Sequence, residues 1–416
     1  MTRRLLADAT PLRRFPAFRR LWAGQLLSGT GSQMTVFAVA LQVYRMTSSS
    51  AAVGGIGLVS GATGITVGLL AGGLLDAVDR RRVVLTCTVL QLATSAALTV
   101  QAFAGTDSLG LLYLLVGVQA ALAAVGAPAR STFLRHLLPA DQLAAGAALQ
   151  MLAGRSGWVV GPAVAGVLTA AGGLELCYLV DTVTFLASLY GALGLPRVPV
   201  VPSGGSDRGL RAIAAGLAFV ARSRVLTGVL LADISATFLA LPTALFPAVN
   251  AERFAGNPQT LGLMSTAMAP GDPAEGLLSG PVGRVQRQGR GMLVSVAVWG
   301  LAIAGFGLAD GLAATLVALA VADAADVSSL ALRAAVIQTA TPEAFRGRVA
   351  ATDHVVGSSV PQLGNFRAGL VATATSPAVS AVSGGLAAAA AAGVLALAFP
   401  ALRRYRVADA REPEPA

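Results

Sequence analysis

The chain has 416 residues, of which 55% are hydrophobic and 12% are charged, and its mean hydropathy is +0.71. Soluble domains carry about 25% charged residues, so this composition excludes an ordinary soluble protein and indicates a membrane protein. The net charge of +10 comes entirely from arginine, and the arginines lie between apolar stretches. That distribution excludes the basic face of a nucleic-acid-binding domain.

Twelve apolar segments are long enough to cross a bilayer as helices, which takes about 20 residues. In chain order they are 21–44, 51–75, 83–104, 109–135, 143–171, 174–195, 226–249, 258–280, 291–309, 312–337, 349–373 and 379–400. The basic segment 1–20 lacks a short apolar core with a cleavage site, so we expect a cytoplasmic tail there and not a signal peptide. The sequence predicts an all-α integral membrane protein with twelve transmembrane helices.

Arginine clusters occur in alternate loops, on the side of the N-terminus. The opposite loops carry only Arg45 and Arg253 as basic residues. By the positive-inside rule both termini are expected in the cytoplasm, and the protein in the cell (inner) membrane. The predicted parts are a six-helix bundle, a linker with an amphipathic helix, a second six-helix bundle and a tail. Their bounds are 1–195, 196–225, 226–402 and 403–416.

An internal repeat supports two similar halves. Arg130 and Pro139 recur 203 positions later as Arg333 and Pro342, in register with several glycines. A repeated membrane unit is typical of secondary transporters. Because the two arginines recur near the cytoplasmic ends of segments 4 and 10, we expect them to close an inner gate.

The loop between segments 2 and 3 carries a glycine, acid and arginine pattern. Its marked residues are Gly72, Gly73, Asp76, Arg80 and Arg81. This pattern resembles the loop signature of the major facilitator superfamily, with Ala77 and Asp79 as departures. An acid at the membrane edge can accept charge-assisted bonds from arginines or from a helix N-terminus, which predicts a gating latch at Asp76. The alternative is a plain positive-inside loop.

Segment 5 contains Gly157, Gly161, Pro162 and Gly166, which resemble the antiporter motif of the same superfamily, with Ala165 in place of one glycine. Glycines four and five apart clear one helix face, and proline bends a helix by removing a backbone hydrogen bond. A bent and closely packed helix can seal the cavity against ion leak, which favours exchange. The alternative is ordinary glycine-rich packing.

Four longer phrases resemble the transmembrane secretion effector branch, which includes enterobactin exporters and macrolide efflux proteins. They lie at 18–34, 257–264, 341–349 and 361–369. The resemblance implies two bundles around a central cavity with alternating access. It also implies export of an amphipathic small molecule such as a drug, macrolide or siderophore.

Four of the acids inside the predicted membrane segments are candidates for function, because charges there are costly and mark functional sites by default. They are Asp181, Asp233, Asp323 and Asp326. We expect proton coupling at these acids, with Asp233 and Asp326 as the leading candidates. The alternative is a structural ion pair with Arg130, Arg155, Arg333 or Arg367.

Six polar residues lie in segments that line the central cavity in this superfamily. The resemblance makes them candidates for substrate contact: Gln25, Ser28, Gln33, Gln119, Gln362 and Asn365.

Segment 8 is interrupted at 270–275, where Pro270, Asp272, Pro273 and Glu275 should break or kink a helix. The interruption is either a specialised cation or proton site or relaxed sequence.

These features predict a proton antiporter for efflux, including multidrug or siderophore export. We expect a monomer whose partners are the substrate, protons and lipid, with no nucleic acid, no metal, no cofactor and no enzymatic activity. A proton symporter that imports a nutrient is the alternative. A non-transporting polytopic membrane protein has less support.

Overall fold

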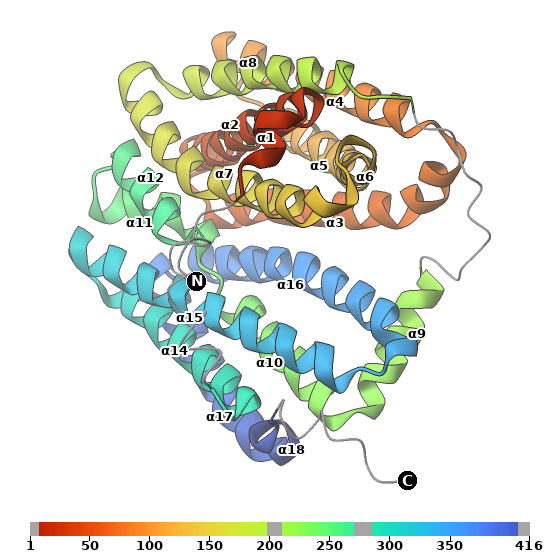
Figure 1. The fold of residues 1–416 in the computed structure, drawn as a ribbon. Coiled ribbons are helices and arrows are strands. Elements are labelled where there is room, and N and C mark those ends of the chain that lie inside the picture. The colour runs from red at the N-terminus through yellow and green to blue at the C-terminus, as the bar shows by residue number, and fades with distance from the viewer. Residues whose placement is uncertain (1–7, 198–209, 270–284, 407–416) are drawn as a thin grey trace. The chain divides into compact units, whose positions relative to one another are not determined.

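A computed structural model describes residues 8–197, 210–269 and 285–406, without the side chains of 71–77, 210–213 and 344. These ranges are helical throughout, apart from the connections, and contain no strand (Figure 1). Nine helices within them are long and apolar enough to span a membrane. The predicted all-helical membrane fold is therefore confirmed.

The helices of the N-terminal half follow the first six predicted segments. They are α1 (Thr10–Arg14), α2 (Pro16–Thr47), α3 (Ser50–Ala77), α4 (Arg80–Phe103), α5 (Leu109–Ser131), α6 (Leu134–Leu137), η1 (Ala140–Gln142), α7 (Leu143–Gly172) and α8 (Leu174–Leu193). Helix α2 begins five residues before the predicted segment. Segment 4 divides into α5 and α6, because the first helix ends at Ser131.

The helices of the C-terminal half follow the remaining segments, with one break. They are α9 (Leu210–Arg222), α10 (Arg224–Ala240), η2 (Thr243–Leu245), α11 (Phe246–Arg253), α12 (Pro258–Ala267), α14 (Gln288–Leu308), α15 (Leu312–Ala340), η3 (Glu343–Phe345), α16 (Arg346–Ala374), α17 (Pro377–Ala398) and α18 (Pro400–Arg404). Segment 7 is broken between α10 and α11, because Pro242 cannot donate a helical hydrogen bond. Only α12 represents segment 8 among the described residues.

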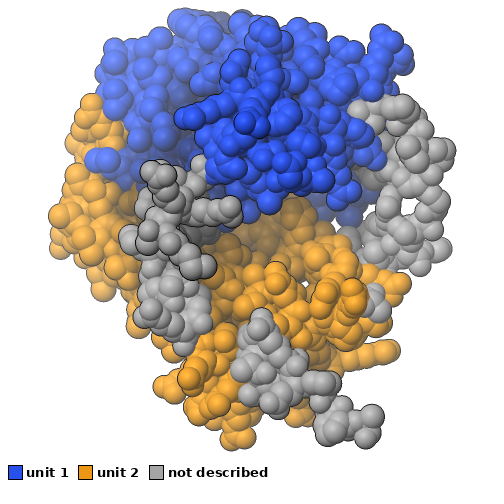
Figure 2. All heavy atoms as spheres, viewed as in Figure 1, with its two compact units in different colours: residues 1–46, 62–206, 261–266 blue, residues 47–61, 207–260, 267–416 orange. Residues whose placement is uncertain are grey.

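Contacts divide the chain into two compact units (Figure 2). Unit 1 comprises 1–46, 62–206 and 261–266, and unit 2 comprises 47–61, 207–260 and 267–416. The predicted boundaries of the two bundles and their linker stay a prediction.

Glycines allow helices within each unit to approach closely. In unit 1, a Cβ on Gly24 of α2 would lie 2.9 Å from the carbonyl oxygen of Ala187 on α8. In unit 2, a Cβ on Gly300 of α14 would lie 2.5 Å from the carbonyl oxygen of Gly385 on α17. Small residues are the usual means of close helix packing in membranes.

The amphipathic helix α9 packs against other helices of unit 2, to which it belongs. Phe219 of α9 stacks on Phe345 of η3 with ring centroids 4.4 Å apart. Val220 of α9 joins a buried cluster with Leu226 and Val349. The apolar face of this helix is therefore partly covered by protein.

Candidate functional site

A buried cluster of charges joins three helices of unit 2. The guanidinium of Arg333 on α15 forms an ion pair with the carboxylate of Asp233 on α10. Its Nε atom also lies 3.7 Å from Oδ1 of Asp353 on α16. The side chains of Arg333 and Asp233 are 9% and 17% exposed. One guanidinium thus lies between two carboxylates from different helices.

Asp326 adds a third carboxylate to this cluster. It lies within electrostatic range of both Asp233 and Arg333. Positions 326 and 333 are two turns apart on α15, so they share a helix face. The cluster therefore contains three carboxylates and one guanidinium.

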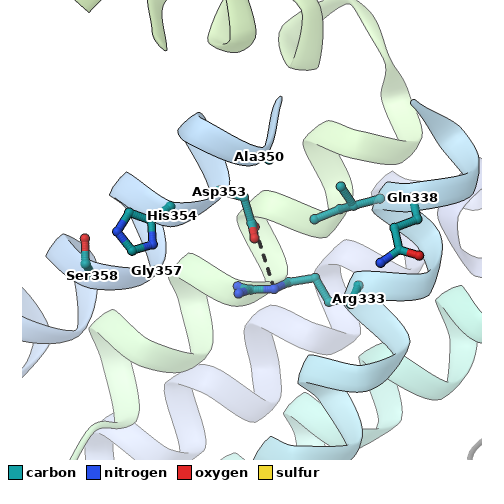
Figure 3. Close-up of a pocket in the computed structure, with 9 residues that line it drawn as sticks. Arg333, Gln338, Ala350, Asp353, His354, Gly357 and Ser358 are labelled. Carbon is teal, nitrogen blue, oxygen red and sulfur yellow. Dashed lines mark ion pairs between the residues drawn. The ribbon is translucent and has the colours of Figure 1, made fainter. Parts of the chain in front are cut away.

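A pocket of about 460 Å³ lies between α15 and α16 beside this cluster. Figure 3 shows Arg333 and Asp353 in this pocket, with His354, Ser358 and Gln338 around them. Its apolar lining comes from Ala334, Ile337, Ala350 and Gly357. The pocket brings the charged cluster next to a space that holds both polar and apolar groups.

The predicted acids fall in different places. The structure brings Asp233 and Asp326 together with Arg333, whereas Asp181 is on α8 in unit 1. Asp323 is buried on α15, one turn before Asp326. The ion-pair alternative applies to Asp233, whose partner is one of the four arginines named from the sequence.

Sequence reasoning missed Asp353. This residue lies in predicted segment 11, two turns after Arg346 at the start of α16. An acid inside an apolar segment is the signal that could have found it, since the same signal marked the other four acids.

Arg130, the repeat partner of Arg333, has different surroundings. It lies on α5, where Nη2 would be 3.3 Å from a Cβ on Gly126, and it interacts electrostatically with Cys87. The inner-gate role of the two arginines stays a prediction.

The loop signature begins in α3, where the side chains of Gly72, Gly73 and Asp76 lie outside the described residues. Asp79, the departure from the family pattern, caps α4 by accepting a 2.9 Å hydrogen bond from the backbone N–H of Arg81. The guanidinium of Arg81 donates to the carbonyl of Leu193, at the end of α8. Arg80 is the first residue of α4. These contacts fix the start of α4, and the latch at Asp76 stays a prediction.

The glycine-proline motif of α7 contacts α2 on one side. A Cβ on Gly157 would lie 3.0 Å from the backbone of Gly29, and one on Gly161 would lie 2.9 Å from the carbonyl oxygen of Thr30. Both positions therefore require glycine for this helix spacing.

The same motif contacts α12 on its other side. A Cβ on Gly262 would lie 2.7 Å from the carbonyl oxygen of Pro162 and 3.2 Å from Cα of Gly166. The hydroxyl of Thr266 donates to the carbonyl of Val159, in the turn that the proline interrupts. Close packing of α7 is thus established within unit 1, and its role in ion sealing stays a prediction.

Some of the six polar candidates make contacts within the protein. Asn365 accepts hydrogen bonds from the Thr243 hydroxyl and the Ala244 backbone N–H, at 2.6 and 3.2 Å. Gln119 donates to the carbonyl of Gln91. The two hydrogen bonds that Asn365 accepts stabilise the break after α10.

The remaining four candidates lie on α2 and α16. Gln362 lies against Gly57 and Gly61 of α3, and Gln33 lies against Gly161 of α7. Gln25 and Ser28 are partly buried on α2. Substrate contact by any of the six stays a prediction, and the interruption at 270–275 lies outside the described residues.

Comparison with known proteins gives the family. The enterobactin exporter EntS of Shigella boydii serotype 18 is 29% identical over 415 residues, which covers 96% of each chain. Solved transporters share the fold. The nucleoside transporter NupG aligns with a TM-score of 0.72 at 15% identity, over 94% of this chain and 100% of that chain. A bacterial homologue of the iron transporter ferroportin, in an inward-facing state, aligns with a TM-score of 0.71 at 16% identity, over 94% and 99%.

Residues 7–415 match the family described as transmembrane secretion effector. The relatives are membrane transporters, and the described helices have the arrangement of major facilitator proteins. The chain therefore belongs to the transmembrane secretion effector family of major facilitator transporters.

Proposed function

We propose that this transporter exports an amphipathic small molecule in exchange for protons. The substrate class is that of siderophores, macrolides or related drugs, and the protein works as a monomer in the cell membrane with both termini in the cytoplasm. Similarity to enterobactin exporters over almost the whole chain supports export, and supports a siderophore as the first substrate to test.

The observation that carries proton coupling is the charge imbalance around Arg333. Three carboxylates surround one guanidinium in a largely buried site. Uncompensated charge inside a membrane protein is costly, and proton binding to a carboxylate removes it. The cluster therefore favours uptake of a proton at Asp233 or Asp326.

Such a proton would change the contacts of Arg333. Once Asp233 is neutral, the guanidinium is attracted to Asp353 on α16 and Asp326 on α15, and less to α10. Because the three acids lie on three helices, protonation changes which helices the arginine holds together. A substrate in the pocket of 460 Å³ lined by Arg333 and Asp353 would sense that change.

The close packing of α7 supports exchange over leak. Gly157 and Gly161 place it against α2, and Pro162 and Gly166 place it against Gly262 of α12, without room for added side-chain atoms. We propose that this packing prevents protons from crossing without a substrate.

The test uses the purified protein in proteoliposomes with enterobactin, a macrolide and a neutral dye as separate substrates. A pH gradient should drive export of the substrate, and collapse of the gradient should abolish it. Asp326→Asn should remove the dependence on the gradient, whereas Glu343→Gln, an exposed acid of η3, should retain it. Undiminished export without a gradient would rule out proton coupling, and substrate accumulation driven by an inward proton gradient would indicate a symporter.

A further inference from the structure

Asp181 on α8 is the buried acid that the charge cluster of unit 2 does not include. Its side chain is fully buried, at 0% exposure. Oδ2 accepts hydrogen bonds from the hydroxyls of Thr35 on α2 and Ser95 on α4, both at 2.8 Å. Oδ1 has no hydrogen-bond partner among the described residues.

Among the described residues, no cation on the helices packed against α8 interacts with Asp181. Oδ1 faces Gly31 of α2, where an added Cβ would lie 2.6 Å away. Within the described chain, the neighbouring groups that stabilise a charge on Asp181 are the hydroxyls of Thr35 and Ser95, through their hydrogen bonds. An ionised carboxylate here would therefore lack both a cation and a donor for one oxygen.

The titratable and charged groups on the neighbouring helices have other surroundings. Tyr178 of α8 donates to Gln42 on α2, and Cys177 contacts Thr169 and the carbonyl of Ala165 on α7. Three more titratable or charged residues do not interact electrostatically with Asp181: Cys87 of α4, Arg20 of α2 and Arg155 of α7. Cys87 belongs to a buried cluster with Phe133, and Arg20 lies over the ring of Tyr190.

A chain of hydroxyls leads away from Asp181. Ser95 lies 3.0 Å from the hydroxyl of Thr182, which lies 2.9 Å from that of Thr99. Thr182 also donates to the carbonyl of Tyr178, one turn toward the start of α8. All these groups lie between α4 and α8.

Beyond this turn, polar groups continue to a pocket at the ends of the helices. Tyr178 donates to Gln42, which exchanges hydrogen bonds with Gln101. Gln42 in turn lines a pocket of about 320 Å³ that also contains the acids Asp107 and Glu175. Tyr178 takes part in both groups, since its carbonyl accepts from Thr182 and its hydroxyl donates to Gln42.

We propose that Asp181 is a second proton-binding site, in which the hydroxyls of Ser95 and Thr182 reorient when Asp181 gains or loses its proton. Hydroxyls both donate and accept, so the chain satisfies Asp181 in either protonation state. When Asp181 is ionised, Ser95 donates to Oδ2. When Oδ2 carries a proton, it donates to Ser95, Ser95 donates to Thr182, and Thr182 donates to the carbonyl of Tyr178.

A proton fits this site better than a metal ion. The oxygen–oxygen distances of 2.8–3.0 Å are those of hydrogen bonds. Among the described residues, no cluster of acids, histidines or cysteines could hold a metal here. Water supplies the proton and takes it back, so the step requires no other reactant.

The test is difference infrared spectroscopy of the purified protein between acid and alkaline buffers, with isotope-labelled aspartate. We expect a titrating carboxyl band that is lost in Asp181→Asn and retained in Asp141→Asn, an exposed acid of unit 1. The band should shift in Thr35→Val and in Ser95→Ala, because each removes one hydrogen bond to the carboxyl group. These two variants decide the question if Asp181→Asn does not fold.

The hydroxyl chain has its own test in the same spectra. Thr182→Val should shift the band of the protonated carboxyl group, because Ser95 then loses the acceptor for its hydroxyl proton. Thr184→Val should not, because its hydroxyl donates to the backbone carbonyl of Asp181 and lies outside the chain. Absence of a titrating band that depends on Asp181, Thr35 and Ser95 would overturn the proton site, and an unshifted band in Thr182→Val would overturn the role of the hydroxyl chain.

These measurements use resting protein without substrate or gradient. Their outcome is therefore independent of proton-coupled export, and failure of one proposal leaves the other open to its own test.

Discussion

Asp233 and Arg333 form an ion pair between α10 and α15, and the repeat partners of these residues do not. The position equivalent to Asp233 in the first half is Thr30, whereas Arg333 corresponds to Arg130. Arg130 lies beside Gly126 on α5 and interacts electrostatically with Cys87. The repeat therefore retains the arginine in both halves and adds the acid in one, which gives the second half a charge pair that the first half lacks.

Removal of Arg333 should destabilise the protein more than removal of Asp233. Arg333→Gln leaves Asp233 and Asp353 without a cation, and loss of one partner of a buried pair costs about 3–5 kcal/mol. Asp233→Asn leaves the guanidinium with Asp353. We expect the melting temperature in detergent to fall more for Arg333→Gln.

A double-mutant cycle provides the control for this comparison. The double variant Asp233→Asn/Arg333→Gln should lose less stability than the two single variants together, because neither charge is then left unpaired. Additive losses would contradict a direct pair.

Gly161 should not tolerate alanine, because α7 contacts α2 at this position. An added Cβ would lie 2.6 Å from Cβ of Gln33 and 2.9 Å from the carbonyl oxygen of Thr30. Overpacking of this kind costs about 1–3 kcal/mol. Thermal unfolding of Gly161→Ala should therefore begin at a lower temperature than that of the wild type.

Gly154 is a matched control on the same helix. Apart from the chain neighbours and the nearby backbone of the same helix, no atom lies within 4 Å of an added Cβ at this position. Gly154→Ala should leave stability unchanged or raise it by about 0.5–1 kcal/mol, because alanine is a better helix former. Equal losses at Gly154 and Gly161 would show that helix spacing does not depend on the motif.

Arg253 should stabilise the end of α14. Its guanidinium donates to the carbonyls of Phe306, Gly307 and Ala309, at 3.2, 2.6 and 2.5 Å. Cations at helix C-termini satisfy free carbonyls and the helix dipole. We expect Arg253→Ala to cost about 1.5–3 kcal/mol, the range for hydrogen bonds to charged groups.

The control for Arg253 is Arg19→Ala, an exposed arginine of α2. It should change the melting temperature little. Arg253→Lys should restore only part of the loss, because an ammonium group cannot reach three carbonyls with the geometry of a guanidinium. Full stability of Arg253→Ala would contradict the capping role.

The helices were predictable because each membrane segment carries its own signal of about 20 apolar residues. The break after α10 also had a local signal, since Pro242 lies inside the predicted segment 226–249, but the apolar run on both sides outweighed it.

The pairing of Asp233 with Arg333 was not predictable in the same way. Each residue was visible as a charge inside the membrane, but no local pattern states which helix faces meet. The roles of Arg81 and Arg253 are equally tertiary, because the carbonyls they contact belong to distant helix ends. The number of arginines in each loop therefore predicts the orientation of the protein in the membrane, but it does not reveal which arginines cap a helix.

The orientation itself is testable with single cysteines. Cys87 and Cys177 are both buried, so the wild type should react slowly with a membrane-impermeant maleimide. Arg82 and Asp107 are exposed and lie at opposite ends of α4. Under the positive-inside rule, Asp107→Cys should react in intact cells, whereas Arg82→Cys should react only in inverted vesicles or after permeabilisation. Reaction of Arg82→Cys in intact cells would show that the orientation is the opposite of the predicted one. It would then place the pocket beside Gln42 on the cytoplasmic side.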